Sequence, residues 1–156
     1  MSSSELNNLF HAKKDRILSR VEPRKSFILT LLYIMVITVS RVYDQPIPDK
    51  GYRVLVDRLW PRGISKEKLK LDAWMKDIAP SDELRKWFSH DPKKWNDFKI
   101  RYFKELDKNP KTKELLKICR NRDVIFLYST KTEETNNAVA LKLYVEEKLK
   151  DQGKKK

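Results

Sequence analysis

Charged and polar side chains follow two apolar runs of the sequence, at the point where each run ends. The first run is residues 54–56, Val-Leu-Val, and the second is residues 124–128, Val-Ile-Phe-Leu-Tyr. The residues that could bind or react are Asp57, Arg58 and Arg62 after the first run, and Tyr128, Ser129 and Lys131 at the end of the second. Because a guanidinium fork binds phosphate or carboxylate through two parallel hydrogen bonds, the arginines suit a small anionic ligand. We therefore expect a phosphate- or carboxylate-bearing molecule to bind where the two ends meet.

Two side chains could move a proton. Asp57 could orient an arginine or handle a proton, and His90 could act as a general acid or base. Each has a structural alternative: Asp57 could pair with an arginine to fix the turn at Pro61 and Gly63, and His90 could be a surface residue between helices. Ser129 has no base near it in the sequence, so a catalytic triad is not predicted. Whether the protein is an enzyme stays open at this point.

The two apolar runs are typical of buried strands, because neither alternates with polar residues. A helix predicted over residues 133–150 follows the second strand. Asn136 and Asn137 near its beginning could contact the ligand or serve only the helix entry. A helix, a strand, a polar turn and another helix in this order predict parallel pairing of the two strands. Their carboxyl ends then meet at one edge of the sheet, where open α/β sheets bind ligands.

The remaining elements complete an α/β domain. Residues 35–39 are predicted as the first strand, and residues 73–78 as a short strand or irregular segment. Helices are predicted to begin after Ser65, Ser81 and Asp91 and to cover residues 112–119. We expect a single compact domain with a small, mostly parallel sheet flanked by helices in three layers, similar to a Rossmann arrangement.

The stretch Gly51–Gly63, GYRVLVDRLWPRG, carries a specific resemblance to a known family. Further matching motifs follow in order: LDAW at 71–74, DIAPS at 77–81, LRKWF at 84–88, HDP at 90–92, LYS at 127–129 and NNAV at 136–139. Between about residue 39 and about residue 148 the chain resembles the YeaO-like proteins, a family with a domain of unknown function. The resemblance implies a compact cytoplasmic α/β protein and supplies no established activity or catalytic residue. Relatives often carry a small, a basic and an acidic residue where this chain has Thr-Lys-Thr at 130–132.

The length of 156 residues suits one domain with a core and terminal extensions. We assign residues 35–150 to the domain, residues 1–34 to an N-terminal extension outside it, and residues 151–156 to a basic tail. The apolar run over residues 27–39 is shorter than the roughly 18 residues that span a bilayer, and no signal cleavage site follows it. We therefore expect no membrane partner, and interpret residues 1–34 as an extension or as a start assigned too far upstream.

The net charge is +13, from 35 lysine and arginine residues against 22 acids. An excess of this size favours anionic partners. Nucleic acid is therefore the alternative partner, held by lysines on helices and by the basic ends of the chain. Plain solubility also explains the excess, and a scaffold or dimerisation domain without a ligand is a third hypothesis. The ligand's identity and the oligomeric state are left open.

Cys119 is the only cysteine, and His11 and His90 are the only histidines. An intrachain disulfide is therefore excluded, which fits a reducing, cytoplasmic location. No set of cysteine, histidine and carboxylate residues has the spacing of metal ligands. We expect no metal and no cofactor, and a buried structural role for Cys119.

Overall fold

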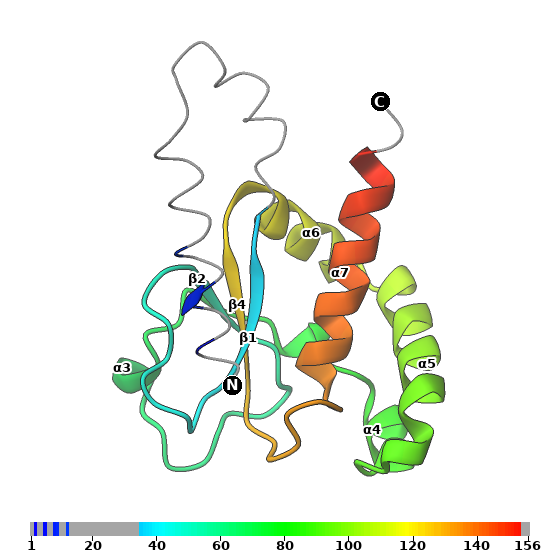
Figure 1. Ribbon diagram of the computed structural model, residues 1–156. Coiled ribbons are helices and arrows are strands. Elements are labelled where there is room, and N and C mark those ends of the chain that lie inside the picture. Colours follow the sequence, from blue (N-terminus) through cyan, green and yellow to red (C-terminus); the bar gives the residue numbers. More distant parts are fainter. Residues whose placement is uncertain (1, 3–4, 6–7, 10–11, 13–34, 154–156) are drawn as a thin grey trace.

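The computed structural model describes residues 2, 5, 8, 9, 12 and 35–153 of the chain (Figure 1). Most of the expected N-terminal extension and the last three residues of the expected basic tail lie outside the described residues. Residues 151–153, by contrast, continue the last helix of the chain. The sheet and the helices that surround it all lie within residues 35–153.

A parallel sheet forms the centre of the described part of the chain. In spatial order its strands are β1 (Ile37–Arg41), β4 (Val124–Tyr128), β2 (Tyr52–Leu55) and β3 (Ala73–Trp74). Each neighbouring pair runs parallel, and Val54 of β2 lies opposite Phe126 of β4. The predicted parallel pairing of the two central strands is confirmed. β1 begins slightly later than the predicted first strand.

Three helical segments begin directly after the capping residues predicted from the sequence. The helices are α3 (Lys66–Leu69), α4 (Asp82–Phe88), α5 (Trp95–Lys108), α6 (Lys111–Asn121) and α7 (Asn137–Gly153), with short 3₁₀ helices η2 (Lys76–Ile78) and η3 (Pro92–Lys94). The side chains of Ser65, Ser81 and Asp91 accept backbone N–H groups in the first turns of α3, α4 and η3. α7 begins later than predicted, because Asn136 caps it by accepting the N–H of Val139 at 3.0 Å.

The two faces of the sheet are covered unequally. Figure 1 shows α4, α5, α6 and α7 to one side of the sheet, and α3 with long loops to the other. Side chains alternate along β4, so Phe126 packs among the four helices while Ile125 and Leu127 pack beneath α3 and the loops. All five residues of β4 are buried, as is typical of a central strand. The predicted class, a compact α/β domain with a small parallel sheet flanked by helices, is confirmed.

Within the described residues, no helix combines the length and the apolar character needed to cross a bilayer. Nor do three or more histidine, cysteine or carboxylate side chains gather closely enough to hold a metal ion. Cys119 is buried, and burial raises the pKa of its thiol to about 12. The thiol therefore stays protonated and unreactive in the core.

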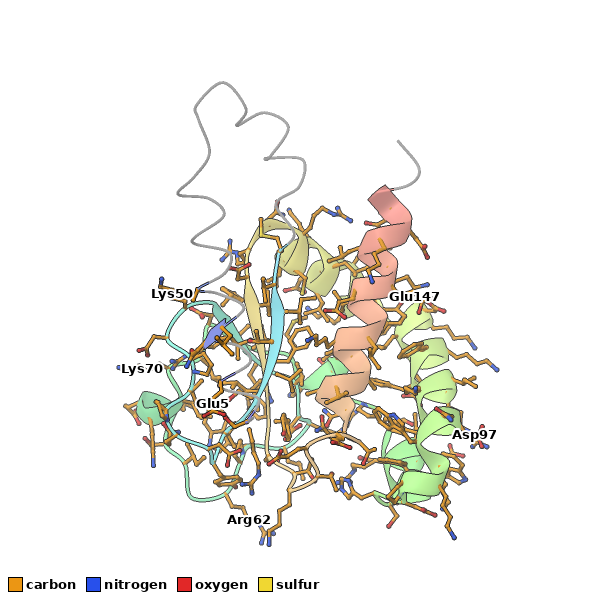
Figure 2. The ribbon with its side chains drawn as sticks, viewed as in Figure 1. Glu5, Lys50, Arg62, Lys70, Asp97 and Glu147 are labelled. Carbon is orange, nitrogen blue, oxygen red and sulfur yellow. The ribbon has the colours of Figure 1, made fainter. Side chains whose placement is uncertain are left out.

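Lys70, which follows α3, provides a test of the backbone conformation. Its φ is 48°, in the left-handed region that disfavours side chains, and its side chain points into solvent (Figure 2). We expect Lys70→Gly to raise the free energy of unfolding by about 0.5–1 kcal/mol, measured by urea denaturation. Lys68→Gly, in the right-handed part of the same helix, should lower it by a similar amount. Loss of stability in both variants would contradict this expectation.

Candidate functional site

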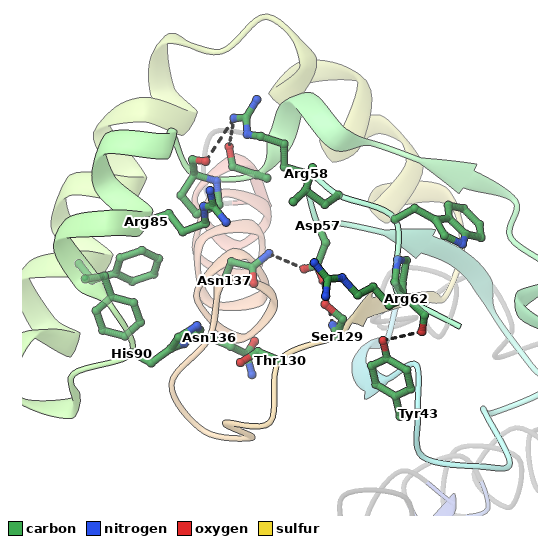
Figure 3. A pocket seen from close by; sticks show the side chains of 17 residues that line it. Tyr43, Asp57, Arg58, Arg62, Arg85, His90, Ser129, Thr130, Asn136 and Asn137 are labelled. Atoms are coloured by element: carbon green, nitrogen blue, oxygen red, sulfur yellow. Dashed lines mark hydrogen bonds between the residues drawn. The ribbon is translucent and has the colours of Figure 1, made fainter. Parts of the chain in front are cut away.

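A cavity of about 360 Å³ opens at the carboxyl ends of β2 and β4 (Figure 3). The predicted site residues that line it are Asp57, Arg58, Arg62, His90, Ser129, Asn136 and Asn137. Further wall is supplied by the segment that follows β2, the segment before α4, and the rings of Phe88 and Phe98. The two strand ends therefore share one hollow, as their parallel pairing predicts.

Asp57 joins three elements inside this cavity. Its Oδ2 accepts the backbone N–H of Ser129 at 2.8 Å and the Ser129 hydroxyl at 2.6 Å. Its Oδ1 accepts the side-chain amide of Asn137 at 3.2 Å, and the same amide donates to the carbonyl of Val56 at 3.1 Å. The carboxylate thus connects the end of β2 to the end of β4 and to the first residue of α7. Because hydrogen bonds to a carboxylate are among the stronger ones, this junction fixes the side chains around it.

Arg58 attaches the segment after β2 to the segment before α4. Its Nη2 donates to the carbonyls of Ala79 at 3.3 Å and Pro80 at 3.2 Å. Its Nε lies 3.8 Å from Oδ1 of Asp82 and has no hydrogen-bond partner among the described residues. Protein oxygens therefore already surround much of this guanidinium. Arg58 therefore holds the cavity wall in place.

The segment before α4 is fixed from α5. Glu105 accepts the N–H of Ser81 at 2.9 Å and the hydroxyl of Ser81 at 2.5 Å. The hydroxyl of Tyr102 donates to the carbonyl of Ile78 at 2.6 Å, and burial raises the pKa of Tyr102 well above its usual value. This phenol therefore stays protonated and keeps donating. Through these contacts α5 sets the position of α4 and of Arg85, which α4 carries to the cavity.

Positive charge dominates the mouth of the cavity. Arg62 is exposed and projects into solvent at the end of the molecule where the strands finish (Figure 2), and it forms no ion pair with a described carboxylate. Arg85 lies on the other side of the cavity (Figure 3) and pairs with Asp82 at 3.3 Å. Among the described lining residues Asp57 is the sole acid, against Arg58, Arg62 and Arg85. The balance favours an anionic group at the mouth.

His90 lines the cavity from the segment after α4. Its φ is 55° and that of the preceding Ser89 is 44°, so two successive residues with side chains adopt the left-handed conformation. Backbone strain of this kind clusters at functional sites. The Nδ1 of His90 lies 3.4 Å from the hydroxyl of Thr132. Within the described residues no hydrogen bond connects His90 to Asp57, so the two do not form a proton relay.

Two predicted site residues lie outside the cavity lining. Tyr128 is buried in the core beneath the helices, and burial is the main reason why its pKa is raised. Lys131 is exposed on the loop between β4 and α7. The chain direction after Ser129 therefore carries the lysine away from the hollow, although the serine itself stays in it.

Two polar lining residues were missed by reasoning from the sequence: Tyr43 and Arg85. Tyr43 donates its hydroxyl to the backbone carbonyl of Arg62 at 2.9 Å. Arg85 belongs to the LRKWF motif at 84–88, which the sequence analysis identified. Its position near β2 and β4 could not be predicted, because it depends on contacts between distant segments. Thr130 follows Ser129 directly, and its hydroxyl belongs to the polar stretch expected at the end of the second strand.

The fold and the site define a small α/β protein with a polar cavity at the carboxyl edge of a parallel sheet. The chain belongs to the DUF488-N3i family, described as the inactive DUF488-N3 subclade, whose family model matches residues 36–156. The predicted YeaO-like membership is confirmed.

Curated relatives cover most of the domain. The uncharacterized protein YeaO of Escherichia coli strain K12 is 44% identical over 108 residues, which cover 69% of this chain and 94% of YeaO. The uncharacterized proteins Mb3100c of Mycobacterium bovis and Rv3073c of Mycobacterium tuberculosis are each 40% identical over 105 residues, 67% of this chain and 89% of theirs. No solved structure matches the chain.

The junction at Asp57 can be tested through stability. Asp57→Ala leaves the N–H and hydroxyl of Ser129 and the amide of Asn137 without their acceptor, so we expect the free energy of unfolding to fall by about 2–3 kcal/mol. Asp57→Asn keeps an oxygen for Ser129 and should lose about 1 kcal/mol or less. Chemical denaturation of the full chain measures both changes. An Asp57→Ala variant as stable as the parent protein would show that the junction does not bear on folding.

Proposed function

We propose that this protein binds a small anionic ligand, bearing phosphate or carboxylate, in the cavity at the carboxyl edge of its sheet. The observation that carries the proposal is the convergence of Arg58, Arg62, Arg85 and His90 on one hollow with a single acid. Guanidinium groups bind both kinds of anion through paired hydrogen bonds.

Neutral groups add to these cations. The hydroxyl of Thr130 lines the same hollow, whereas the side-chain N–H groups of Asn136 and Asn137 are already donated to protein oxygens. α7 begins at Asn137, so the positive end of a 17-residue helix lies at the cavity edge. Groups of this kind supplement the arginines and give the bound anion a defined orientation.

The cavity volume favours a metabolite over a polymer. A volume of about 360 Å³ falls within the range that is typical of small-molecule pockets. Leu59, Pro61, Phe88 and Phe98 provide apolar wall between the polar groups. Small-molecule sites combine apolar walls and a few placed polar groups in this manner.

Binding is favoured over catalysis. His90 and Asp57, the two candidates for proton transfer, make no hydrogen bond with each other in the described part of the chain. The hydroxyl of Ser129 donates to Asp57, and no histidine is in contact with it there. The family is described as inactive, which agrees with recognition without turnover. We therefore assign Asp57 and His90 to ligand recognition.

Ligand-induced stabilisation tests this proposal. Phosphomonoesters and small carboxylates are screened against the full chain, and a ligand at a hundredfold excess over its Kd should raise the Tm by about 5–10 °C. Arg62→Ala should weaken binding about fivefold, because an exposed charge contact is worth up to about 1 kcal/mol. Lys131→Ala is the matched control, since it removes an exposed cation that does not line the cavity.

Two outcomes would contradict the proposal. Equal losses in Arg62→Ala and Lys131→Ala would mean that the anion responds to general surface charge. Tight binding of duplex DNA that falls by several orders of magnitude between about 50 and 200 mM salt would favour the nucleic-acid alternative.

A further inference from the structure

Asp57 is out of place in a cavity that only binds anions. It is the sole acid among the described lining residues, and a carboxylate there repels an anionic guest. Hydrogen bonds from Ser129 and Asn137 nevertheless hold its carboxylate in place. The Asp57 carboxylate would weaken the binding of a purely anionic ligand. We therefore look for a group in the ligand that binds this carboxylate.

The acceptor capacity of Asp57 is not exhausted. Each carboxylate oxygen can accept two hydrogen bonds. Oδ2 is saturated by the N–H and the hydroxyl of Ser129, at 2.8 and 2.6 Å. Oδ1 accepts from Asn137 at 3.2 Å, and this is its single hydrogen bond within the described residues. One acceptor site on Oδ1 is therefore left for a ligand.

The Asp57 carboxylate also has no side-chain cation in direct contact among the described residues. No described lysine or arginine forms an ion pair with it. Arg58 is engaged with the carbonyls of Ala79 and Pro80, and Arg62 projects from the mouth into solvent. A half-buried carboxylate without a cation gains from a charged donor brought by the ligand.

We propose that the ligand is bipolar: its anionic group is held at the mouth by Arg62, and a protonated amine donates to Oδ1 of Asp57 deeper in the cavity. This inference rests on the proposed function and narrows it to small zwitterions, meaning amino phosphates or amino acids. Opposite charges at the two positions fix the direction in which the ligand enters. They also discriminate against inorganic phosphate, which cannot supply the amine.

Matched ligands test the inference on the full-length protein by isothermal titration calorimetry. O-phosphoethanolamine carries phosphate and amine, ethyl phosphate lacks the amine, and phosphocholine keeps the positive charge without an N–H donor. γ-Aminobutyrate and butyrate form the corresponding carboxylate pair. In whichever set binds, the phosphates or the carboxylates, we expect the ligand with the amine to have a Kd about tenfold lower or more than its amine-free counterpart. Phosphocholine should bind much more weakly than O-phosphoethanolamine.

Asp57→Asn should abolish the advantage of the amine while the variant still binds ethyl phosphate or butyrate. Lys131→Ala is the control, because it removes an exposed cation that does not line the cavity and should keep the advantage. The parent-protein comparison remains decisive if Asp57→Asn does not fold.

The failures of the two proposals are distinguishable. Equal affinity for amine-bearing and amine-free ligands in the parent protein would overturn the bipolar ligand and leave anion binding intact. If folded Asp57→Asn still binds the amine-bearing ligands more tightly than the amine-free ones, the bipolar ligand is also overturned, because a group other than Asp57 would then bind the amine. If no member of either set binds at millimolar concentration, the proposed function itself is overturned, and the bipolar ligand with it.

Discussion

The contact between Asp57 and Ser129 is the interaction on which the site depends. It bridges 72 positions of sequence with two hydrogen bonds to one oxygen, and Asn137 adds a third to the other oxygen. Parallel pairing of β2 with β4 brings the two strand ends to the same edge, but pairing alone does not orient a side chain. The Asp57 carboxylate is oriented by its hydrogen bonds, because one oxygen accepts from Ser129 after β4 and the other accepts from Asn137 at the beginning of α7.

A second set of contacts places the opposite wall. Glu105 on α5 holds the N-cap of α4 through Ser81, and Arg58 reaches from the end of β2 to the carbonyls just before that cap. Contacts from α5 and from the end of β2 therefore determine the positions of Arg85 and of the segment that leads to His90. The cavity is the space between these two fixed walls. Its polar groups are bound mainly to one another, which is why we propose recognition without catalysis.

Much of the central sheet was predictable because it is encoded locally. The apolar runs at 54–56 and 124–128 predict two buried strands, and an intervening helix predicts that they run parallel, which places Asp57 near Ser129. Lys131 lies outside the cavity because the loop after Ser129 is shaped by Asn136, whose amide donates to the carbonyls of Thr132 and Glu133. Arg85 was missed because the position of α4 depends on a residue of α5, Glu105, which holds Ser81.

The location of a bound ligand tests the central claim most directly. In a titration of ¹⁵N-labelled full-length protein with O-phosphoethanolamine, we expect the amide signals of residues 57–60, 62 and 129–137 to shift together and to saturate. The signals of Gly51 and Asp123, at the amino ends of β2 and β4, should stay unchanged. Shifts confined to the exposed lysines of α5 and α6, with the strand ends unaffected, would contradict a binding site at this edge of the sheet.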